Sequence, residues 1–496
     1  MPVYPRKPFK KVGSVIYPVI PTDTLAMIVN SSYGVSWDES ADSYVRTGAL
    51  AGIAVGSSPG NALLPIQAAM RRCVINNSGV VQYYLDPADS TLKVGGGAAV
   101  LTGADGQVMV EIPAFYYRYA YAGTTHTWEI SQVPLAGFSL HPAFIKNNLF
   151  VPYRYIGAYE GTLYDVSASI YTDGIYQTAV SCVFANVDSS LTIASRTGVF
   201  SLLTVGDKIV VSGTAANNGT KTVASLVSAT KITIAEAVTD GTDAATVIQT
   251  EKDWTATTGD VLSSISGKAP INYGTRANFR AAALNRGTGW RLQDYDLISA
   301  IQLLDLTEYA SFYSQSMIGA GLTDWSAAWP AYNDYNSINN TGLSNAKGNT
   351  TFNLSNGNGV VGSYMTYRGI ENWYGHLWKW VDGINFDTNI KPYVTNTQPF
   401  ADDTATNYTA LNVTLPASGW QNNLQQQSRG FLPISVGAPG SATTKITDYV
   451  YTSGGGWQVV RLGGTADDGA RAGAFYVPAH SASSYLNRNV GGRLAF

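Results

Sequence analysis

The C-terminal forty residues alternate between apolar and polar positions at both ends and are polar in the middle. Trp457 and Val459 mark one alternating run, and Leu494 and Phe496 close the chain with another; a period of two is typical of β-strands. The segment between them is rich in Asp, His, Ser, Tyr and Asn. We therefore predict two strands that hold a surface loop, where binding residues tend to gather. An ordinary polar loop before a last strand would show the same pattern.

Short apolar runs elsewhere predict more strands. Residues 80–85 and 107–113 are two such runs, and the aromatic run from Phe115 to Tyr121 is a third. Between about 171 and 251, Val/Ile/Thr runs are spaced by turns, one of them at residues 217–219. That spacing predicts a small β-sandwich or barrel. Because aromatic-rich sequence resumes on both sides, we interpret it as an inserted module.

Helical periodicity begins only after Ala269. Thr275 is placed to cap a helix over residues 276–286, and Gly287 to end it. A second helix is predicted from an apolar face with helical spacing, formed by Leu297, Ile301 and Leu304. Residues 319–363 show no periodicity and predict a long loop. A dense aromatic strand region follows at residues 368–383.

Composition narrows the class of protein. A chain of 496 residues is too long for a single hydrophobic core. Charged residues make up only 13% of it, and 31 residues are Tyr. With a net charge of −3, the chain lacks the excess of positive charge that would attract nucleic acid or an anionic membrane. Cys73 and Cys182 lie in apolar runs and are predicted to be buried free thiols. The N-terminal segment lacks the pattern of a signal peptide or a membrane span, so we expect synthesis in the cytoplasm without a signal peptide and no membrane insertion.

Several blocks together resemble the formylglycine-generating enzyme family. They are residues 276–279 with 289–296, 375–382, 155–160, and the arginines Arg461, Arg471 and Arg493 of the C-terminal blocks. The resemblance implies a C-type lectin-like fold, within an α+β class that is mostly β. The resemblance covers residues 105–170 and 252–496, so we expect four regions: a β-rich docking or collar region (1–104), the first part of the lectin-like domain (105–170), the inserted small β domain (171–251) and the rest of the lectin-like domain (252–496).

A closer resemblance is to bacteriophage tail-fibre receptor-binding proteins of this fold, including variable proteins diversified by retroelements. It rests on residues 107–117, 137–144 and the terminal Gly-Gly-Arg-Leu. It implies a homotrimer in the virion tail, attached to other tail proteins through its N-terminal region. It also implies C-terminal loops that recognise a host-surface glycan or protein. Residues 448–487 contain Tyr, Ser, Asn, Asp and His, the residue types that such diversified loops display. The protein sequence alone does not show diversification.

Catalysis is less well supported by the residues. The oxidase chemistry of the formylglycine-generating enzymes needs cysteines near the C-terminal core, where this chain has none. A tail-associated glycan hydrolase needs paired carboxylates, for which the candidates are Asp294 with Asp296, Asp402 with Asp403, and Asp467 with Asp468. Adjacent acids more often cap helices or form turns. We therefore expect no enzyme.

The histidines add no catalytic or metal site. We expect His141 and His376 to be structural, and His480 to be a surface contact. No cofactor is predicted and no zinc spacing is present, although loop carbonyl oxygens leave a structural calcium ion open.

The predicted receptor-facing patch combines tyrosines for buried area with polar side chains for hydrogen bonds. It consists of Tyr449, Tyr451, Asp467, Asp468, Tyr476, His480, Ser481, Ser483, Ser484, Tyr485 and Asn487. The frame beneath it is predicted to consist of Trp457, Arg461, Arg471, Arg493 and Phe496. A structural tail or decoration protein without receptor binding is the alternative from another class.

Overall fold

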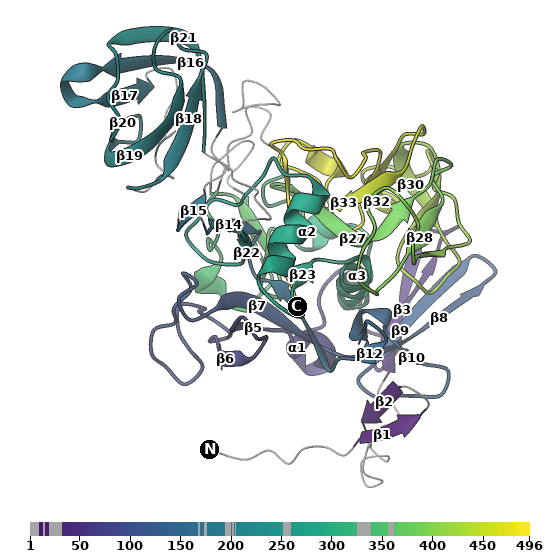
Figure 1. The fold of residues 1–496 in the computed structure, drawn as a ribbon. Coiled ribbons are helices and arrows are strands. Elements are labelled where there is room, and N and C mark those ends of the chain that lie inside the picture. Colours follow the sequence, from purple (N-terminus) through teal and green to yellow (C-terminus); the bar gives the residue numbers. More distant parts are fainter. Residues whose placement is uncertain are drawn as a thin grey trace.

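Strands form most of the described structure and are arranged in several sheets with few helices (Figure 1). The fold is thus α+β and mostly β, as predicted. The computed structural model describes residues 9–12, 15–18, 32–166, 169–172, 176–193, 200, 203, 205–250, 259–324, 339–355 and 362–496.

A six-stranded antiparallel sheet joins strands from the N-terminal quarter of the chain to its last strand. Its order is β23 (Arg291–Leu292), β36 (Leu494–Ala495), β13 (Tyr153–Gly157), β7 (Gln107–Pro113), β5 (Arg71–Ile75) and β6 (Val81–Tyr84). A five-stranded antiparallel sheet follows the order β10 (Ser139–Leu140), β8 (Tyr116–Ala122), β9 (Thr125–Ser131), β3 (Ser32–Asp38) and β4 (Ser43–Gly48). Strands from both sides of residue 104 pair within each sheet. The boundary predicted at 104 therefore runs through shared sheets and does not separate two bodies.

Two further sheets carry the C-terminal third. One has the order β29 (Thr409–Ala410), β28 (Pro392–Val394), β27 (Trp378–Phe386) and β33 (Gln458–Leu462), with β35 (Val490–Gly491) parallel to β27. The other has the order β31 (Pro433–Val436), β30 (Gly419–Leu424), β32 (Ile446–Thr452) and β34 (Val477–Ala479). Because β34 pairs in parallel with β32, the segment predicted to be a surface loop runs through a sheet instead.

Residues 176–250 contain a closed six-stranded barrel, which confirms the predicted small β module. Its order is β16 (Tyr176–Ala185), β17 (Ser190–Ile193), β20 (Lys231–Ile234), β19 (Gly219–Ser228), β18 (Lys208–Ser212) and β21 (Gly241–Thr250). Its apolar core contains barrel residues alone, including Cys182. Figure 1 shows the barrel standing apart from the main body. It is inserted between β15 (Ile170–Thr172) and β22 (Val261–Ser263), which flank β14 (Thr162–Asp165).

Helix α2 (Arg276–Asn285) begins as the sequence predicts. The Thr275 side chain accepts a hydrogen bond from the backbone N–H of Asn278, and the Asn278 side chain accepts one from the N–H of Thr275. This reciprocal cap satisfies two N–H groups that a helix start leaves unpaired. Gly287 follows the helix with a positive φ of 132°.

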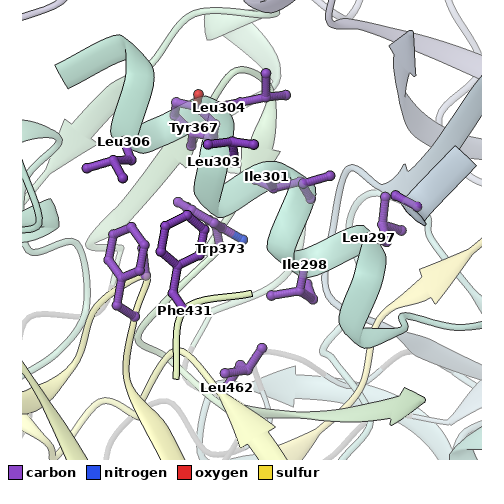
Figure 2. Packing of buried hydrophobic residues seen from close by; sticks show 14 of the residues in the cluster. Leu297, Ile298, Ile301, Leu303, Leu304, Leu306, Tyr367, Trp373, Phe431 and Leu462 are labelled. Atoms are coloured by element: carbon purple, nitrogen blue, oxygen red, sulfur yellow. The ribbon is translucent and has the colours of Figure 1, made fainter. Parts of the chain in front are cut away.

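Helix α3 (Tyr295–Tyr309) lies at the centre of the body and is buried on every side. Leu297, Ile301 and Leu304 have no exposed surface, as predicted. The sequence predicts one apolar face, however, while the polar residues of this helix are buried too. Figure 2 shows Leu297, Ile298, Ile301, Leu303, Leu304 and Leu306 of α3 close to aromatic side chains of other segments, including Trp373 and Phe431.

The remaining elements are short. The paired strands are β1 (Phe9–Val12) with β2 (Val15–Pro18), β11 (Ile145–Lys146) with β12 (Leu149–Phe150), and β24 (Phe352–Leu354) with β25 (Tyr364–Tyr367) and β26 (Ile370–Glu371). The short helices are α1 (Pro65–Ala68), α4 (Ser314–Met317), and the 3-10 turns η2 (Asn61–Leu63), η3 (Pro142–Phe144), η4 (Asn186–Asp188), η5 (Asn345–Lys347) and η6 (Gly469–Arg471). The loop predicted at 319–363 thus contains η5 and β24, and its residues 325–338 and 356–361 lie outside the described residues.

Candidate functional site

Three strands bring the predicted patch together near the C-terminus. In the parallel pair of β32 and β34, Tyr451 lies beside Pro478 and Thr452 beside Ala479. An isolated bridge then joins Ser481 to Val459 of β33. The chain after β34 is therefore held between two strands, and residues distant in sequence meet on one side of the body.

Arg461 of β33 is the centre of this site. Its guanidinium carbon lies 4.7 Å from the ring centre of Tyr485, 5.4 Å from that of Trp378 and 5.8 Å from that of Trp380. Its Nη2 atom donates hydrogen bonds to His480 Nε2 at 2.9 Å and to Ser481 Oγ at 3.1 Å. A desolvated guanidinium over aromatic faces stabilises by about 2 kcal/mol. As predicted for a frame residue, Arg461 is buried.

His480 is held uncharged at neutral pH by this arrangement. An arginine can only donate, so Nε2 of His480 accepts the hydrogen bond and carries no proton. Burial, followed by the positive charge of Arg461, lowers the pKa of His480 to about 4. The imidazole ring lies 4.4 Å from the ring of Tyr451 in a T-shaped contact. The site thus presents a neutral imidazole next to an exposed phenol.

Tyr476, which we predicted to be a main contact residue, belongs to the interior. It is 3% exposed and its ring lies 4.6 Å from that of Trp378 in a T-shaped contact. Burial, followed by the charge of Asp468, raises its pKa. The prediction was wrong because the segment from Ala472 to Ala479 is made of small, apolar and aromatic residues that pack beneath the surface.

Ser481 and Ser483 are also corrected from contact residues to buried ones. Ser481 accepts from Arg461. The backbone N–H and the hydroxyl of Ser483 donate to the carboxylate of Asp403, at 2.9 and 2.7 Å. These bonds fix the path of the chain below the surface and leave neither hydroxyl facing outward.

Asp467 and Asp468 form a turn stabilised by Thr465. The Thr465 backbone N–H donates to Asp468 Oδ2 at 2.7 Å, and the Thr465 hydroxyl contacts both carboxylates. Burial, followed by the negative charge of Asp467, raises the pKa of Asp468 to about 6. Asp467 is exposed and Asp468 is half-buried, so the turn offers carboxylate oxygens to an external hydrogen-bond donor.

Eight of the predicted residues reach solvent around the buried centre. Tyr451, Asp467 and Ser484 are exposed, and the others are half-buried. We call these eight residues the rim: Tyr449, Tyr451, Asp467, Asp468, His480, Ser484, Tyr485 and Asn487. Asn487 donates to the Tyr485 hydroxyl at 3.0 Å, so members of the rim hold one another in place.

Two neighbours of the rim were not predicted as contacts. Arg471, placed in the frame by the sequence, is exposed and lies 5.0 Å from the ring centre of Tyr449. Trp420, on β30, makes a T-shaped contact at 5.4 Å with Tyr449 and is partly exposed. The cross-strand pairing of Trp420 with Tyr449 places it there, and no short-range pattern in the sequence reveals such a pairing.

Of the other frame residues, Trp457 and Phe496 are half-buried and Arg493 is buried, and the ring of Trp457 lies 5.6 Å from that of Tyr393. Arg493 donates to the carbonyl oxygens of Gly157, Glu371 and Asn372. Phe496 packs at 5.1 Å against the ring of Trp290.

The remaining candidate acids make structural bonds. Asp294 caps α3 through the Leu297 N–H. Three carboxylates form ion pairs with arginines: Asp294 with Arg154 at 2.5 Å, Asp296 with Arg429 at 2.7 Å and Asp402 with Arg280 at 2.8 Å. In the pairs Asp294–Asp296 and Asp402–Asp403, ion pairs with arginines therefore hold at least one carboxylate, whereas hydrogen bonds from Thr465 hold Asp467 and Asp468.

The other histidines and the cysteines behave as the sequence predicts. His141 is buried and accepts from the Ala143 N–H, and His376 is buried against Glu160. Cys73 and Cys182 are buried and free.

In the described ranges, no three His, Cys, Asp or Glu side chains come together as a metal site, and the structural calcium ion stays an open prediction. None of the helices that the structure describes combines the length and hydrophobicity needed to span a bilayer. Comparison with known proteins finds no family model and no curated protein that matches this chain.

Proposed function

We propose that this chain is a bacteriophage tail-fibre receptor-binding protein that recognises a host-surface receptor through the rim. The observation that carries the proposal is the contrast between the rim and its floor. Exposed Tyr451 and Ser484 lie above the buried guanidinium of Arg461 and the aromatic rings around it. A binding surface gains affinity when its contacts are held in place before the ligand arrives.

The chemistry of the rim suits recognition. Tyrosines supply large amphipathic contact area at low entropic cost, while Ser, Asn and Asp supply adjustable hydrogen bonds. The carboxylates of Asp467 and Asp468 add acceptors. This set can bind sugar hydroxyls or polar protein groups, so a glycan and a protein both remain within the proposal.

The further parts of the proposal rest on the resemblance of the sequence, and the contrast between rim and floor suits one of them. Side chains that reach solvent from a rigid floor can change without disturbing the core, which suits a surface diversified by a retroelement. Copies in a homotrimer on a virion tail, attached through the N-terminal region, would add avidity to modest single-site contacts. A C-type lectin-like fold remains part of the proposal.

The test compares two tyrosines of equal exposure. Tyr451 in the rim and Tyr153 at the start of β13 are each 43% exposed. The purified protein is incubated with a panel of bacterial strains and with a glycan array, and retention is measured. We expect retention that falls at least about tenfold, or about 1.4 kcal/mol, in the double variant Tyr451→Ala/Ser484→Arg. Tyr153→Ala should leave it unchanged.

Other results would contradict the proposal. If no strain and no glycan is retained, the alternative of a structural tail or decoration protein takes its place. If retention occurs but both variants behave as the wild type, the receptor binds elsewhere on the chain. Release of sugar from a retained glycan would instead favour the hydrolase, although the candidate acids are held in structural bonds.

A further inference from the structure

A buried cluster beneath the body's surface brings an amine, an amide and a carboxylate together. Glu160 Oε1 lies 3.0 Å from Lys379 Nζ. The other oxygen, Oε2, accepts from Asn372 Nδ2 at 3.4 Å and from His376 Nδ1 in a short contact. All four side chains are nearly inaccessible to solvent. One carboxylate therefore touches a lysine amine with one oxygen and an asparagine amide with the other.

The backbone holds two members of this cluster in an unusual conformation. Asn372 has a φ of 46° and His376 a φ of 62°, in the left-handed region, where Asn and His are among the commoner residues other than glycine. Such conformations persist where surrounding structure forces them, and they gather at functional positions. Here the Asn372 N–H donates to the Met365 carbonyl and the His376 N–H to the Leu322 carbonyl. The fold therefore maintains this placement against a local cost.

The amine of Lys379 is prepared for nucleophilic attack. Burial is the largest influence on it and lowers its pKa to about 8; the charge of Glu160 opposes burial, and the charge of Arg493 adds to it. A large share of the amine is thus unprotonated near pH 8, and a lysine activated by desolvation is a nucleophile. The amide oxygen of Asn372, Oδ1, has no hydrogen-bond partner among the described residues.

The carboxylate of Glu160 is ionised and lies within reach of both the amine and the amide. Burial acts to raise its pKa, but the charges of His376 and Lys379 outweigh burial and lower it to about 2. Glu160 is therefore ionised at neutral pH, and it contacts the amine and the amide together. A group that accepts a proton at one atom and returns it at another must lie within hydrogen-bond reach of both.

We propose that Lys379 and Asn372 form an intramolecular isopeptide bond, with Glu160 as the catalytic residue. Lys379 Nζ attacks Asn372 Cγ and a C–N bond forms. Glu160 takes a proton from Nζ and transfers it to Nδ2, the Cγ–Nδ2 bond breaks and ammonia leaves. One amine and one primary amide give one secondary amide and ammonia, so no oxidant or other reactant is needed. His376 acts as a positioning residue on the carboxylate.

The mass of the purified full-length chain tests the bond directly. We expect the intact mass to be lower than the sequence mass by one ammonia, about 17 Da. Trypsin cleaves after a free lysine, so the peptide that begins at Gly369 should remain uncut at Lys379. A succinimide at Asn218-Gly219 would also lose ammonia, but it would leave Lys379 cleavable. A wild-type chain with full mass and complete cleavage after Lys379 overturns the proposal.

Variants assign the roles once the bond is seen. Glu160→Gln should restore the full mass and the cleavage, while Asn372→Asp should lose water, about 18 Da, in place of ammonia. The matched control is Glu371→Gln, because Glu371 is equally buried but bonds to Ser344 instead; its mass loss should persist. If the Glu160→Gln chain is still linked, Glu160 is not the catalyst and that part of the proposal fails.

Discussion

Asp305 in α3 is a buried carboxyl group, and we predict that asparagine at this position stabilises the protein above neutral pH. Asp305 belongs to none of the ion pairs that the described residues form, and its Oδ1 atom has no hydrogen-bond partner there. Burial, together with the charges of Glu308 and Asp448, raises the pKa of Asp305 well above its usual range. An uncharged amide of the same shape avoids that penalty.

Proton linkage gives the sign of the effect. The folded pKa of Asp305 is raised above the unfolded value of about 3.9. The folded protein therefore binds this proton more tightly. The stability that Asp305 contributes is present below about pH 4 and is lost as the pH rises through the folded pKa. The Asp305→Asn variant has no such loss, so its advantage over the wild type should be absent near pH 4 and grow as the pH rises.

The expected gain is a difference between two costs. A buried charge without compensation costs about 3–5 kcal/mol. An asparagine amide whose buried N–H groups lack acceptors costs about 1–3 kcal/mol. The Asp305→Asn variant should therefore unfold with a free energy about 2 kcal/mol higher than the wild type near pH 8.

A second acid on the same helix provides the control. Glu308 is also buried, but its carboxylate binds Arg368 at 2.5 Å and the Ser58 hydroxyl at 2.7 Å. Glu308→Gln breaks this pair and should cost about 3–5 kcal/mol at the same pH. Two carboxyl-to-amide changes one helical turn apart are thus expected to have opposite signs.

Differential scanning calorimetry between about pH 4 and pH 8 measures both variants, with the transition of the body followed apart from that of the barrel. If Asp305→Asn melts below the wild type near pH 8, the reasoning is refuted. The same conclusion follows if its advantage does not shrink on acidification, because then the effect does not come from the proton.

Two further predictions concern the architecture. Residues 176–250 should fold alone. A chain in which a short Gly/Ser linker replaces 173–260 should keep the melting transition of the body, because β15 and β22 flank β14 and the linker has to span only about 10 Å. A circular dichroism spectrum of an unfolded chain, for either part, would contradict this. Tyr476→Ala should cost about 3–5 kcal/mol in urea unfolding, whereas exposed Tyr451→Ala should change it by less than about 0.5 kcal/mol; equal costs would contradict the burial of Tyr476.

Local patterns along the sequence determined many of the elements. The apolar run at 107–113 coincides with β7, and Thr275 caps α2 where its position in the sequence predicts. The turn at 217–219 joins two strands of the barrel. These features depend on neighbours a few residues away, through side-chain alternation, capping and turn conformation. The sequence also identified the segment that supplies the rim.

Only the tertiary structure decided which side chains of that segment face outward. The sequence pattern does not distinguish Tyr476 from Tyr451. Because β34 carries the chain beneath the surface in parallel with β32, Tyr476 becomes part of the core. The meeting of Glu160 with Lys379 likewise depends on segments more than two hundred residues apart. Composition and periodicity report the neighbours of a residue along the chain, whereas burial and partners follow from strand pairings that close long loops.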